Sequence, residues 1–491
     1  MATINMKSSS LKAVLLGAAG VYAVDNGLAR TPQMGWNNWN TFACEVSESL
    51  LLDTSSLLLE YGLRDLGYNY VVLDDCWSKG RGDDGYLIVD DVKFPRGMKS
   101  VSDKLHKQGL LFRMYSSAGE MTCARYAGSL DYEPQDAKSF ASWGVDYLKY
   151  DNCYHMGRFG TPKVSFDRFN EMAKALKATG RSILYGLCSW GEDYVHTWGP
   201  SIANSWRISG DIYDSFSRPD ALCGCGDPTD PHCVAPGTHF APYIDRGLPG
   251  GWNDLDMLEV GLGGMTEEEY KAHFSMWAAL KSPLLLGNDL REMDATTLSI
   301  INNPAIIAIS QDPGCKSVQR VFRNTSVPQD EFGIGETHVW SGPLANGDQV
   351  VILLNAADED LDMTVSLQEI FVTDGVGGTA PQNQQDRAIH DLWSNGHSRM
   401  TKVDAEEILS AKTGAPRAEV LRNQRVYNAT QMPYADGIAA GDSRLFGEKI
   451  GVVSAGGQIS SRVARHAAKV FRLRSVRGWD QPRKTLVKQE L

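Results

Sequence analysis

The sequence predicts an α/β protein, in which a (β/α)8 TIM barrel is followed by a C-terminal antiparallel β-sandwich domain. Short apolar runs alternate with longer amphipathic stretches from about residue 28 to about residue 312. Strands that alternate with helices indicate a parallel sheet, and a count of such units approaching eight favours a closed barrel. After about residue 315 the helical periodicity almost vanishes, and short strands separated by turn residues are typical of a sandwich.

The expected barrel strands are apolar runs, at residues 68–73, 110–115, 145–150, 182–187 and 283–287. The expected helices lie between them, at residues 47–61, 101–108, 165–179 and 266–280. In the third of these, apolar residues recur at spacings of three and four, which indicates one buried face.

The region beyond the barrel has short strand candidates, at residues 321–324, 337–341, 349–355 and 362–366. One helical stretch is expected near residues 404–409, and Gly and polar residues predict a loop at 375–387. The expected domains are therefore a barrel at 24–315, a sandwich at 316–476 and a surface tail at 477–491.

The composition excludes several classes of protein. Hydrophobic residues make up 42% and charged residues 22%, which excludes a mainly disordered chain. The 48 Lys and Arg against 60 Asp and Glu give a net charge of −12, which argues against binding of nucleic acid. No stretch reaches ~18 uninterrupted apolar residues, so no membrane span is expected.

The N-terminus predicts secretion. Lys7 and Lys12 precede a short apolar run at residues 13–24, and Ala23 offers a small residue for cleavage. Together these features indicate a signal peptide at residues 1–23 and an extracellular protein. Asn324 and Asn428 begin sequons that can accept glycans if they are exposed.

The nine cysteines fit an oxidising compartment, and their odd number leaves at least one unpaired within the chain. The sequence holds neither paired Cys-x-x-Cys motifs nor His-Glu-x-x-His, so no structural zinc site is indicated.

Polar residues follow nearly every expected barrel strand, where barrel enzymes place their sites. Solvated carboxylates or helix caps would explain any one of them. They explain poorly why Lys149 and Asp151, two positions apart on one strand, should both point into the barrel. The strand-end residues with suitable chemistry are Asp74, Asp75, Tyr115, Lys149, Asp151, Cys188, Trp190, Arg207, Asp211 and Asp254.

Inward carboxylates with Trp residues, and without metal ligands, favour glycoside hydrolysis. That reaction needs one carboxyl group to protonate the leaving oxygen and another to attack or stabilise the anomeric carbon. The nucleophile must stay ionised, and we expect Lys149 to lower the pKa of a neighbouring carboxyl group such as Asp151. Chemistry alone does not decide which Asp has which role.

Five motifs in order resemble glycoside hydrolase family 27, above all its secreted fungal α-galactosidases: Met34–Trp39, Leu73–Trp77, Tyr147–Cys153, Trp206–Asp211 and Gly251–Met257. The resemblance runs from about residue 28 to about residue 474. It implies a retaining hydrolase of α-galactosides, a (β/α)8 barrel followed by an antiparallel domain, and neither metal nor cofactor.

The resemblance also implies roles for single residues. Asp151 matches the nucleophile and Asp211 the acid/base, while Asp74 and Asp75 match the pair that binds the 4- and 6-hydroxyls of galactose. The remaining candidates for substrate binding are Trp39, Tyr115, Lys149, Cys188, Trp190, Arg207, Asp254 and Met257. Trp39 and Tyr115 could instead be core residues if taken alone.

Two disulfides are implied by the resemblance, Cys44–Cys76 and Cys123–Cys153. Cys188 is expected as a free thiol that lines the pocket. The pairing of Cys223, Cys225, Cys233 and Cys315 stays open.

The loop after the expected strand at residues 182–187 faces the sugar 2-position in this family. Ser189 is small, as in α-N-acetylgalactosaminidases, whereas the large Glu192 favours a free 2-hydroxyl. We therefore predict an exo-acting α-galactosidase that acts on galacto-oligosaccharides and galactomannan side chains. The alternatives are an α-N-acetylgalactosaminidase and a catalytically silent galactose-binding protein.

Overall fold

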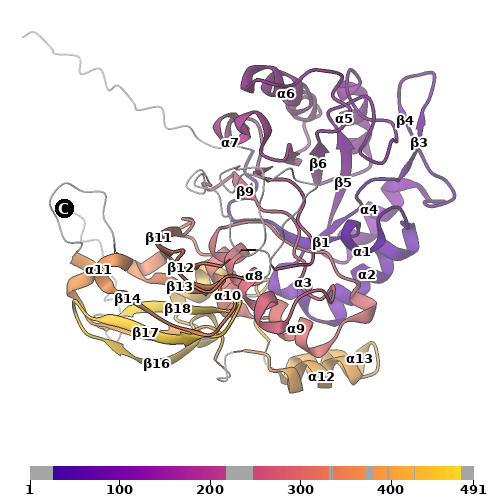
Figure 1. Ribbon diagram of the computed structural model, residues 1–491. Coiled ribbons are helices and arrows are strands. Elements are labelled where there is room, and N and C mark those ends of the chain that lie inside the picture. Colours follow the sequence, from indigo (N-terminus) through magenta and orange to yellow (C-terminus); the bar gives the residue numbers. More distant parts are fainter. Residues whose placement is uncertain are drawn as a thin grey trace, which may run out of the picture.

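The computed structural model describes residues 26–216, 247–330, 333, 335–371, 381–394, 399–424 and 426–476. The chain forms a parallel barrel and an antiparallel β domain that lie side by side (Figure 1). The expected signal peptide, the tail at 477–491 and the loop with Cys223, Cys225 and Cys233 lie outside the described residues.

Eight parallel strands form one sheet in the order β10-β1-β2-β5-β6-β7-β8-β9. This order repeats the order along the chain, with the last strand beside the first. The N–H of Leu258, just beyond β9, donates to the carbonyl of Leu285 in β10 at 2.7 Å, which joins the two ends of the sheet. The predicted (β/α)8 barrel is therefore confirmed. Its strands are β1 (Met34–Asn37), β2 (Tyr70–Val72), β5 (Leu111–Ser117), β6 (Tyr147–Asp151), β7 (Leu184–Cys188), β8 (Ser205–Arg207), β9 (Trp252–Asp254) and β10 (Leu284–Leu286).

The four predicted barrel helices are present, with ends that differ by one to four residues. Side-chain caps set some of these ends. The Ser47 hydroxyl accepts the N–H of Leu50, and the Thr161 hydroxyl accepts the N–H of Val164. The helices of this region are α1 (Trp39–Phe42), α2 (Glu48–Glu60), α3 (Leu63–Leu66), α4 (Gly97–Lys107), α5 (Glu133–Ser142), α6 (Pro162–Ala178), α7 (Val195–Trp198), α8 (Glu267–Ala279), α9 (Ala295–Ile301) and α10 (Pro304–Ser310), and a hairpin of β3 (Ser78–Arg81) and β4 (Leu87–Val89) projects beside them.

The antiparallel domain contains a six-stranded sheet and a two-stranded sheet. The larger sheet has the order β11 (Gln319–Asn324), β12 (Thr337–Pro343), β13 (Gln349–Asn355), β18 (Ala468–Ser475), β15 (Arg387–Asp391) and β16 (Glu448–Val453). The smaller sheet pairs β14 (Leu361–Ser366) with β17 (Gln458–Val463), and α11 (Leu367–Ile370) follows β14. Val351, Leu353, Val365, Val463 and Phe471 belong to one buried cluster, which forms the core between the sheets. The predicted sandwich is confirmed.

The strand β13 is buried on both faces, and its two faces serve different cores. Val351 and Leu353 belong to the sandwich core, whereas Val350, Ile352 and Leu354 belong to the core cluster of the barrel. This alternation follows from the two-residue period of a strand. The helix α8 packs against β18 of the same sheet and so lies between the two domains (Figure 1).

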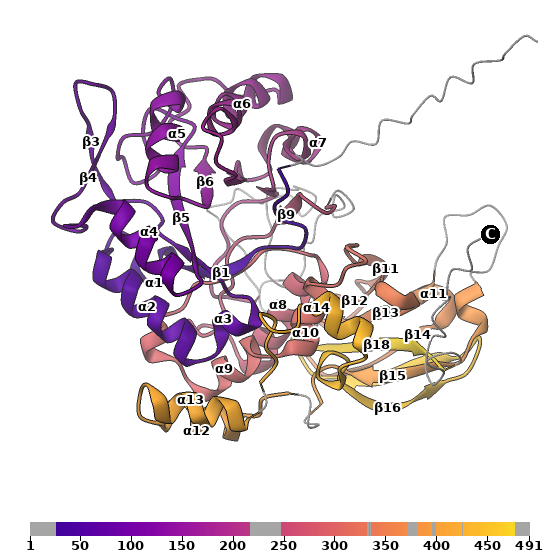
Figure 2. The same ribbon diagram turned by 180° about the vertical axis from the view of Figure 1, so that it is seen from behind.

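Among the described residues, three helices lie between β15 and β16, where one was expected, namely α12 (Lys402–Ser410), α13 (Ala415–Asn423) and α14 (Tyr434–Ala440). Figure 2 shows α12 and α13 below the barrel, next to α9. An ion pair of 2.7 Å between Arg417 and Glu60 ties α13 to the barrel. The expectation of a single helix was wrong because α13 buries only Arg417 and therefore shows no apolar periodicity.

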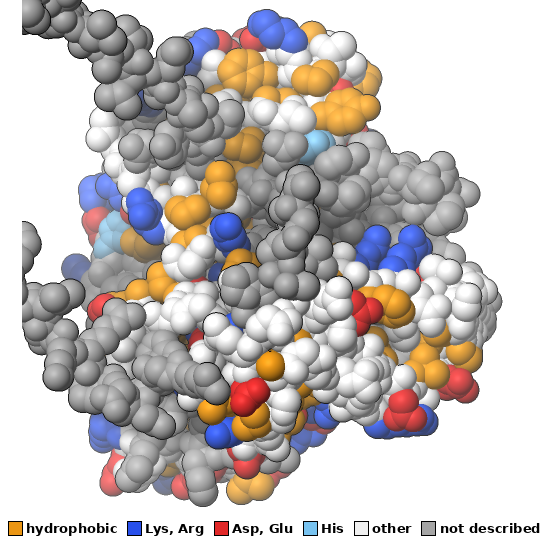
Figure 3. Space-filling view, turned by 90° about the vertical axis from the view of Figure 1, so that its left-hand side faces the viewer, with side chains coloured by type: hydrophobic (Ala, Val, Ile, Leu, Met, Phe, Trp, Pro, Cys, Tyr) orange, Lys and Arg blue, Asp and Glu red, His pale blue; other side chains and the backbone are white. Residues whose placement is uncertain are grey.

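Within the described ranges, no helix is long and apolar enough to span a bilayer. On the face shown in Figure 3, Lys and Arg side chains stand beside Asp and Glu side chains and form no single basic band among the described residues.

Candidate active site

A cavity of about 620 Å³ opens at the carboxyl ends of the barrel strands. Residues in or just after seven successive strands, β1, β2 and β5 to β9, line it. Every predicted site residue except Asp254 lines this cavity. They are Trp39, Asp74, Asp75, Tyr115, Lys149, Asp151, Cys188, Trp190, Arg207, Asp211 and Met257.

Asp151 ends β6 and is 5% exposed. The Tyr115 hydroxyl donates to its Oδ2 at 2.9 Å, and the N–H of Asn152 donates to its Oδ1 at 2.9 Å. Burial raises the pKa of Asp151 to about 6, because the lowering effect of Lys149 is smaller and the charge of Asp211 raises it further. Lys149 therefore lowers the pKa of Asp151 as expected, but the effect of burial is larger, and the resulting pKa lies above the ordinary value.

The Lys149 ammonium lies on Asp74 instead. Its Nζ is 2.9 Å from Asp74 Oδ2, and the Asn37 amide donates to the same oxygen at 2.8 Å. Burial alone would raise the pKa of Asp74, but Lys149 and Asn37 together hold it below its ordinary value. Asp74 is therefore a buried, charged acceptor at the floor of the cavity.

The neighbouring Asp75 differs from Asp74. Burial raises its pKa, although the N–H groups of Ala124 and Cys76 donate to its two oxygens at 2.9 and 2.7 Å. Two adjacent carboxyl groups with different partners can therefore offer a ligand two distinct hydrogen-bonding sites.

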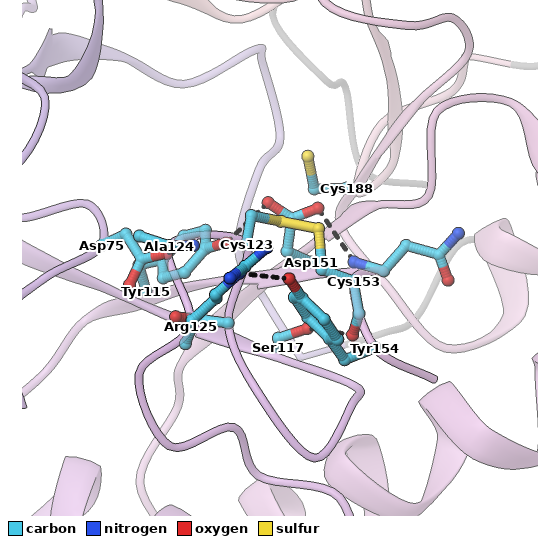
Figure 4. The surroundings of a disulfide bond; sticks show 12 residues. Asp75, Tyr115, Ser117, Cys123, Ala124, Arg125, Asp151, Cys153, Tyr154 and Cys188 are labelled. Carbon is cyan, nitrogen blue, oxygen red and sulfur yellow. Dashed lines mark hydrogen bonds between the residues drawn. A yellow bond between two sulfur atoms is a disulfide. The ribbon is translucent and has the colours of Figure 1, made fainter. Parts of the chain in front are cut away.

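The expected disulfides Cys44–Cys76 and Cys123–Cys153 are both present. Figure 4 shows Cys123–Cys153 directly beside Asp151, with Asp75 and Ala124 on the side of Cys123. This disulfide thus joins the segment that serves Asp75 to the end of the strand that carries Asp151. Among the described residues, the group that could hold a metal by its spacing is Cys123, Asp151 and Cys153, but its two sulfurs are bonded to each other.

A glycine makes the close packing of this loop possible. A Cβ at Gly119 would lie 1.8 Å from the carbonyl oxygen of Cys153, so no larger residue fits without a backbone shift.

Cys188 and Cys315 are free and buried. Cys188 lines the cavity as expected, and an N–H of Arg207 points to its sulfur at 3.7 Å. Burial and the nearby Asp151 charge raise the pKa of the Cys188 thiol well above its ordinary value, so it is neutral. Cys315 instead directs its thiol to the carbonyls of Arg30 and Asp312.

Asp211 lines the same cavity as Asp151, but its side chain is 66% exposed. It follows β8 in a segment, residues 208–216, that contains no helix or strand and that we call the Asp211 loop. The buried Arg207 guanidinium lies 3.0 Å from Asp211 and 2.9 Å from Asp256, so one cation holds two carboxylates.

The sequence indicated Asp254, but Asp256 lines the cavity. Asp254 ends β9, and its Oδ1 accepts the N–H of Asp256 at 2.9 Å. Asp256 has φ +89°, so the chain leaves strand geometry there. Burial raises the pKa of Asp256 to about 6, with Arg207 opposing this and Asp211 adding to it.

The loop after β7 presents Cys188 and Trp190 to the cavity. The Ser189 side chain is buried and does not line the cavity, and Glu192 accepts a hydrogen bond of 2.8 Å from the Asn152 amide. The residue that reaches the cavity beside Cys188 is therefore the bulky Trp190, at φ +56°.

Several lining residues were not predicted: Asn40, Thr41, Ile212, Tyr213, Asp214, Asp256, Glu259 and Leu262. Glu259 has the largest shift among them. Burial, with the charges of Asp256 and Asp214, raises the pKa of Glu259 to about 9, and the Asn40 amide donates to it at 2.9 Å. Its position two residues after Met257, in the loop that already supplied a candidate, was the available signal.

The two sequons lie away from the cavity. Asn324 ends β11 and is half-buried, and its side-chain oxygen accepts the N–H of Ser326 at 2.9 Å. Asn428 is also half-buried, and its amide nitrogen donates to Asp65 of α3 at 3.0 Å.

The cavity therefore combines one deep carboxylate on a strand, one exposed carboxylate on a loop, a charged pair at its floor and aromatic side chains on its walls. Two carboxyl groups facing one cavity supply the acid and the nucleophile that cleavage of a glycosidic bond requires.

Comparison with known proteins agrees with this chemistry. The family profile described as "Alpha galactosidase A" matches residues 31–312, and the profile "Alpha galactosidase C-terminal beta sandwich domain" matches residues 334–415. The α-galactosidase of Zygotorulaspora mrakii is 49% identical over 478 residues, which cover 96% of this chain and 98% of the relative.

Solved structures give the same result. The α-galactosidase of Saccharomyces cerevisiae has a TM-score of 0.85 and 47% identity, with 92% of this chain and 99% of that chain covered. A structure of the S. cerevisiae enzyme with raffinose matches equally well. α-Galactosidase I of Mortierella vinacea has a TM-score of 0.74 and 40% identity, with 92% and 98% covered. This chain therefore belongs to the α-galactosidase family, glycoside hydrolase family 27.

Proposed function

We propose that the chain is a retaining exo-α-galactosidase that removes terminal α-galactose from oligosaccharides and galactomannan side chains. The observation that carries the proposal is the pair of carboxylates, Asp151 and Asp211, that line one cavity at the carboxyl ends of the barrel strands. Asp151 attacks the anomeric carbon while Asp211 donates a proton to the leaving oxygen. Asp211 then acts as the base for the water that releases galactose.

The environment of each carboxylate suits its role. Asp151 is buried and held by two hydrogen bonds, which fix the attacking oxygen. Asp211 is exposed toward the opening, where the leaving group and the water must pass. At a pH above about 6, Asp151 is mostly ionised in the empty enzyme and can act as a nucleophile.

Substrate binding falls to the remaining residues of the cavity. Asp74 and Asp75 accept hydrogen bonds from the 4- and 6-hydroxyls, and an axial 4-hydroxyl distinguishes galactose from glucose. Lys149 and Arg207 donate to sugar oxygens, and Trp39, Tyr115 and Met257 form apolar walls. Trp190 fills the space beside Cys188 and favours a sugar with a small 2-substituent.

Trapping of the covalent intermediate tests the assignment. A 2-fluoro-galactosyl inactivator slows the second step, so its adduct should accumulate on the peptide that contains Asp151. An adduct on any other carboxylate would overturn the assignment of the nucleophile.

Two nitrophenyl glycosides test the choice of sugar. We expect faster hydrolysis of the α-galactoside than of the α-N-acetylgalactosaminide. The reverse order would support the function as an α-N-acetylgalactosaminidase.

We also infer that the protein is secreted after removal of residues 1–23, and that the barrel and the β domain meet near residues 315 and 316. N-terminal sequencing of the mature protein tests the first inference.

Loss of mass on enzymatic deglycosylation would show whether Asn324 or Asn428 carries a glycan. At Asn428 a glycan would replace the contact between the amide and Asp65.

A further inference from the structure

The Asp211 loop is anchored at its far end by the β domain. Residues 208–216 have no regular structure of their own, so contacts with other elements must fix the position of Asp211. Near β8, Arg207 and Asp256 hold the loop, since the N–H of Ile212 donates to Asp256 at 3.1 Å. These contacts belong to the cavity itself.

Beyond Asp211, the helix α8 supplies a second anchor. The Tyr270 hydroxyl lies 2.9 and 3.0 Å from the two oxygens of Asp214. The N–H of Gly264 donates to the same carboxylate, and a Cβ at Gly264 would lie 2.2 Å from the Asp214 carbonyl. The loop and the chain before α8 therefore fit together without room for a side chain.

The third anchor comes from the β domain. His466 lies in the turn between β17 and β18, and its ring stacks on Phe216 with centroids 4.5 Å apart and planes 19° apart. Both side chains are almost fully buried, at 3% exposure for Phe216 and 4% for His466. Stacked rings of this kind pack closely and exclude water.

A carboxylate of α8 orients the His466 ring. Nδ1 of His466 lies 2.6 Å from Oε1 of Glu269, whose other oxygen accepts the N–H and hydroxyl of Thr266 in the capping box of α8. Burial alone would raise the pKa of Glu269, but His466 and Thr266 lower it, so the carboxylate is charged and accepts the Nδ1–H. Glu269 and Tyr270 are neighbours on α8, and together they serve both outer anchors.

We propose that His466 of the β domain is a positioning residue for Asp211. His466 acts through its stack on Phe216 and its hydrogen bond to Glu269. This inference rests on the proposed role of Asp211 as acid/base. The β domain thereby takes part in proton donation without touching the substrate.

A displaced acid has a kinetic signature that general damage lacks. An activated leaving group such as nitrophenolate departs without a proton, whereas an alkoxide needs one. We therefore compare kcat/KM for nitrophenyl α-galactoside and for methyl α-galactoside, because this constant reports the first step. Loss of folded protein would lower both values alike and leave their ratio unchanged.

The test uses His466→Ala in the full-length enzyme, with Phe216→Leu as a milder change that removes the ring stack but keeps apolar bulk. The control is His338→Ala, because His338 in β12 is another buried His that pairs with a carboxylate, that of Glu336 just before the strand. Active sites are counted by the 2-fluoro-galactosyl label. Asp211→Ala gives the reference for complete loss of the acid.

In His466→Ala and in Phe216→Leu, we expect kcat/KM for methyl α-galactoside to fall about tenfold more than that for the nitrophenyl glycoside. We expect the wild-type ratio in His338→Ala. If Asp211→Ala lowers both constants alike, the proposed acid is wrong. Suppose that Asp211→Ala lowers kcat/KM more for methyl α-galactoside than for the nitrophenyl glycoside. The positioning role is then overturned if His466→Ala keeps the wild-type ratio of the two constants. If His466→Ala does not fold, a wild-type ratio in Phe216→Leu overturns it.

Discussion

The two proposed catalytic carboxylates are built in opposite ways. Asp151 ends the barrel strand β6, pairs in register with Ser117 on one side and Cys188 on the other, and is 5% exposed. Asp211 stands in a loop without regular structure, and its side chain is 66% exposed. One is fixed by the sheet, and the other by side chains from a helix and a second domain.

This difference matches what each group must do. The nucleophile attacks one atom, so a rigid sheet is a suitable support for it. The acid/base must meet a leaving group and then a water molecule, so it needs access to the opening. A loop provides that access, and the contacts with α8 and His466 compensate for the order that the loop lacks.

The largest expected effect comes from removal of the Asp151 carboxylate. Asp151→Asn keeps the shape of the side chain but cannot form the glycosyl–enzyme bond, so we expect kcat to fall by about 10⁴-fold or more. The loss should be similar for nitrophenyl and alkyl galactosides, unlike the loss in Asp211→Ala. Steady-state kinetics on both substrates check this, and activity that survived for either substrate would contradict it.

Removal of the Cys123–Cys153 disulfide beside Asp151 should have the next largest effect. The Cys123–Cys153 bond closes a loop with a sequence separation of 30, so replacement of both residues by Ser should cost about 3 kcal/mol of unfolding free energy. Denaturant unfolding measures this loss.

The Cys44–Cys76 double variant is the matched comparison, because its sequence separation is 32. Equal losses of stability are expected. Each disulfide also holds one N–H that donates to Asp75, that of Ala124 or that of Cys76, so KM should rise in both variants. kcat should fall more without Cys123–Cys153, because that disulfide lies beside Asp151 (Figure 4), and equal kcat values would show that Asp151 keeps its place without the bond.

The charge next to Asp151 should set the acid limb of the pH profile. Lys149 lowers the pKa of Asp151 from the value that burial alone would give, so its removal must raise that pKa further above about 6. In Lys149→Met, we expect the acid limb of kcat/KM to move to higher pH by about one unit or more. The exposed Lys163 of α6 gives the control, Lys163→Met, which should leave the limb in place.

The smallest effect on activity is expected for Glu259, in the loop that follows β9. The pKa of Glu259 is raised to about 9, so Glu259 is neutral at working pH, and Glu259→Gln should change kcat/KM by less than about twofold. A tenfold loss near pH 5 would show that Glu259 takes part in the reaction.

The same variant should change stability with a defined sign. Glu259 binds a proton in the folded state and loses it on unfolding between its ordinary pKa and about 9, so wild-type stability falls as pH rises through that range. Glu259→Gln removes this dependence, and it should be more stable than the wild type at pH 7 by roughly 1–3 kcal/mol. Thermal unfolding at pH 5, 7 and 9 checks the trend.

Most of the site residues around Asp151 could be predicted from the sequence. Asp74 and Asp75 come just after one apolar strand and Asp151 ends another, and residues at that place in a barrel face the same opening. Lys149 and Asp151 share a face because strands alternate. These rules depend only on short stretches of sequence, so they do not require the tertiary structure.

The surroundings of Asp211 and Asp256 could not be predicted in the same way. Alternation places Asp254 and Asp256 on one face, and only the left-handed backbone at Asp256 decides which of them reaches the cavity. The contacts of Asp214 with Tyr270 and of Phe216 with His466 join residues 56 and 250 positions apart, and no local pattern marks such partners.

The strand β13 makes the two cores inseparable. Val350, Ile352 and Leu354 face the barrel, whereas Val351 and Leu353 face the sandwich. Removal of either domain would therefore expose an apolar surface on the domain that remains. We therefore expect the barrel and the β domain to unfold together, and neither to stay soluble when it is expressed alone.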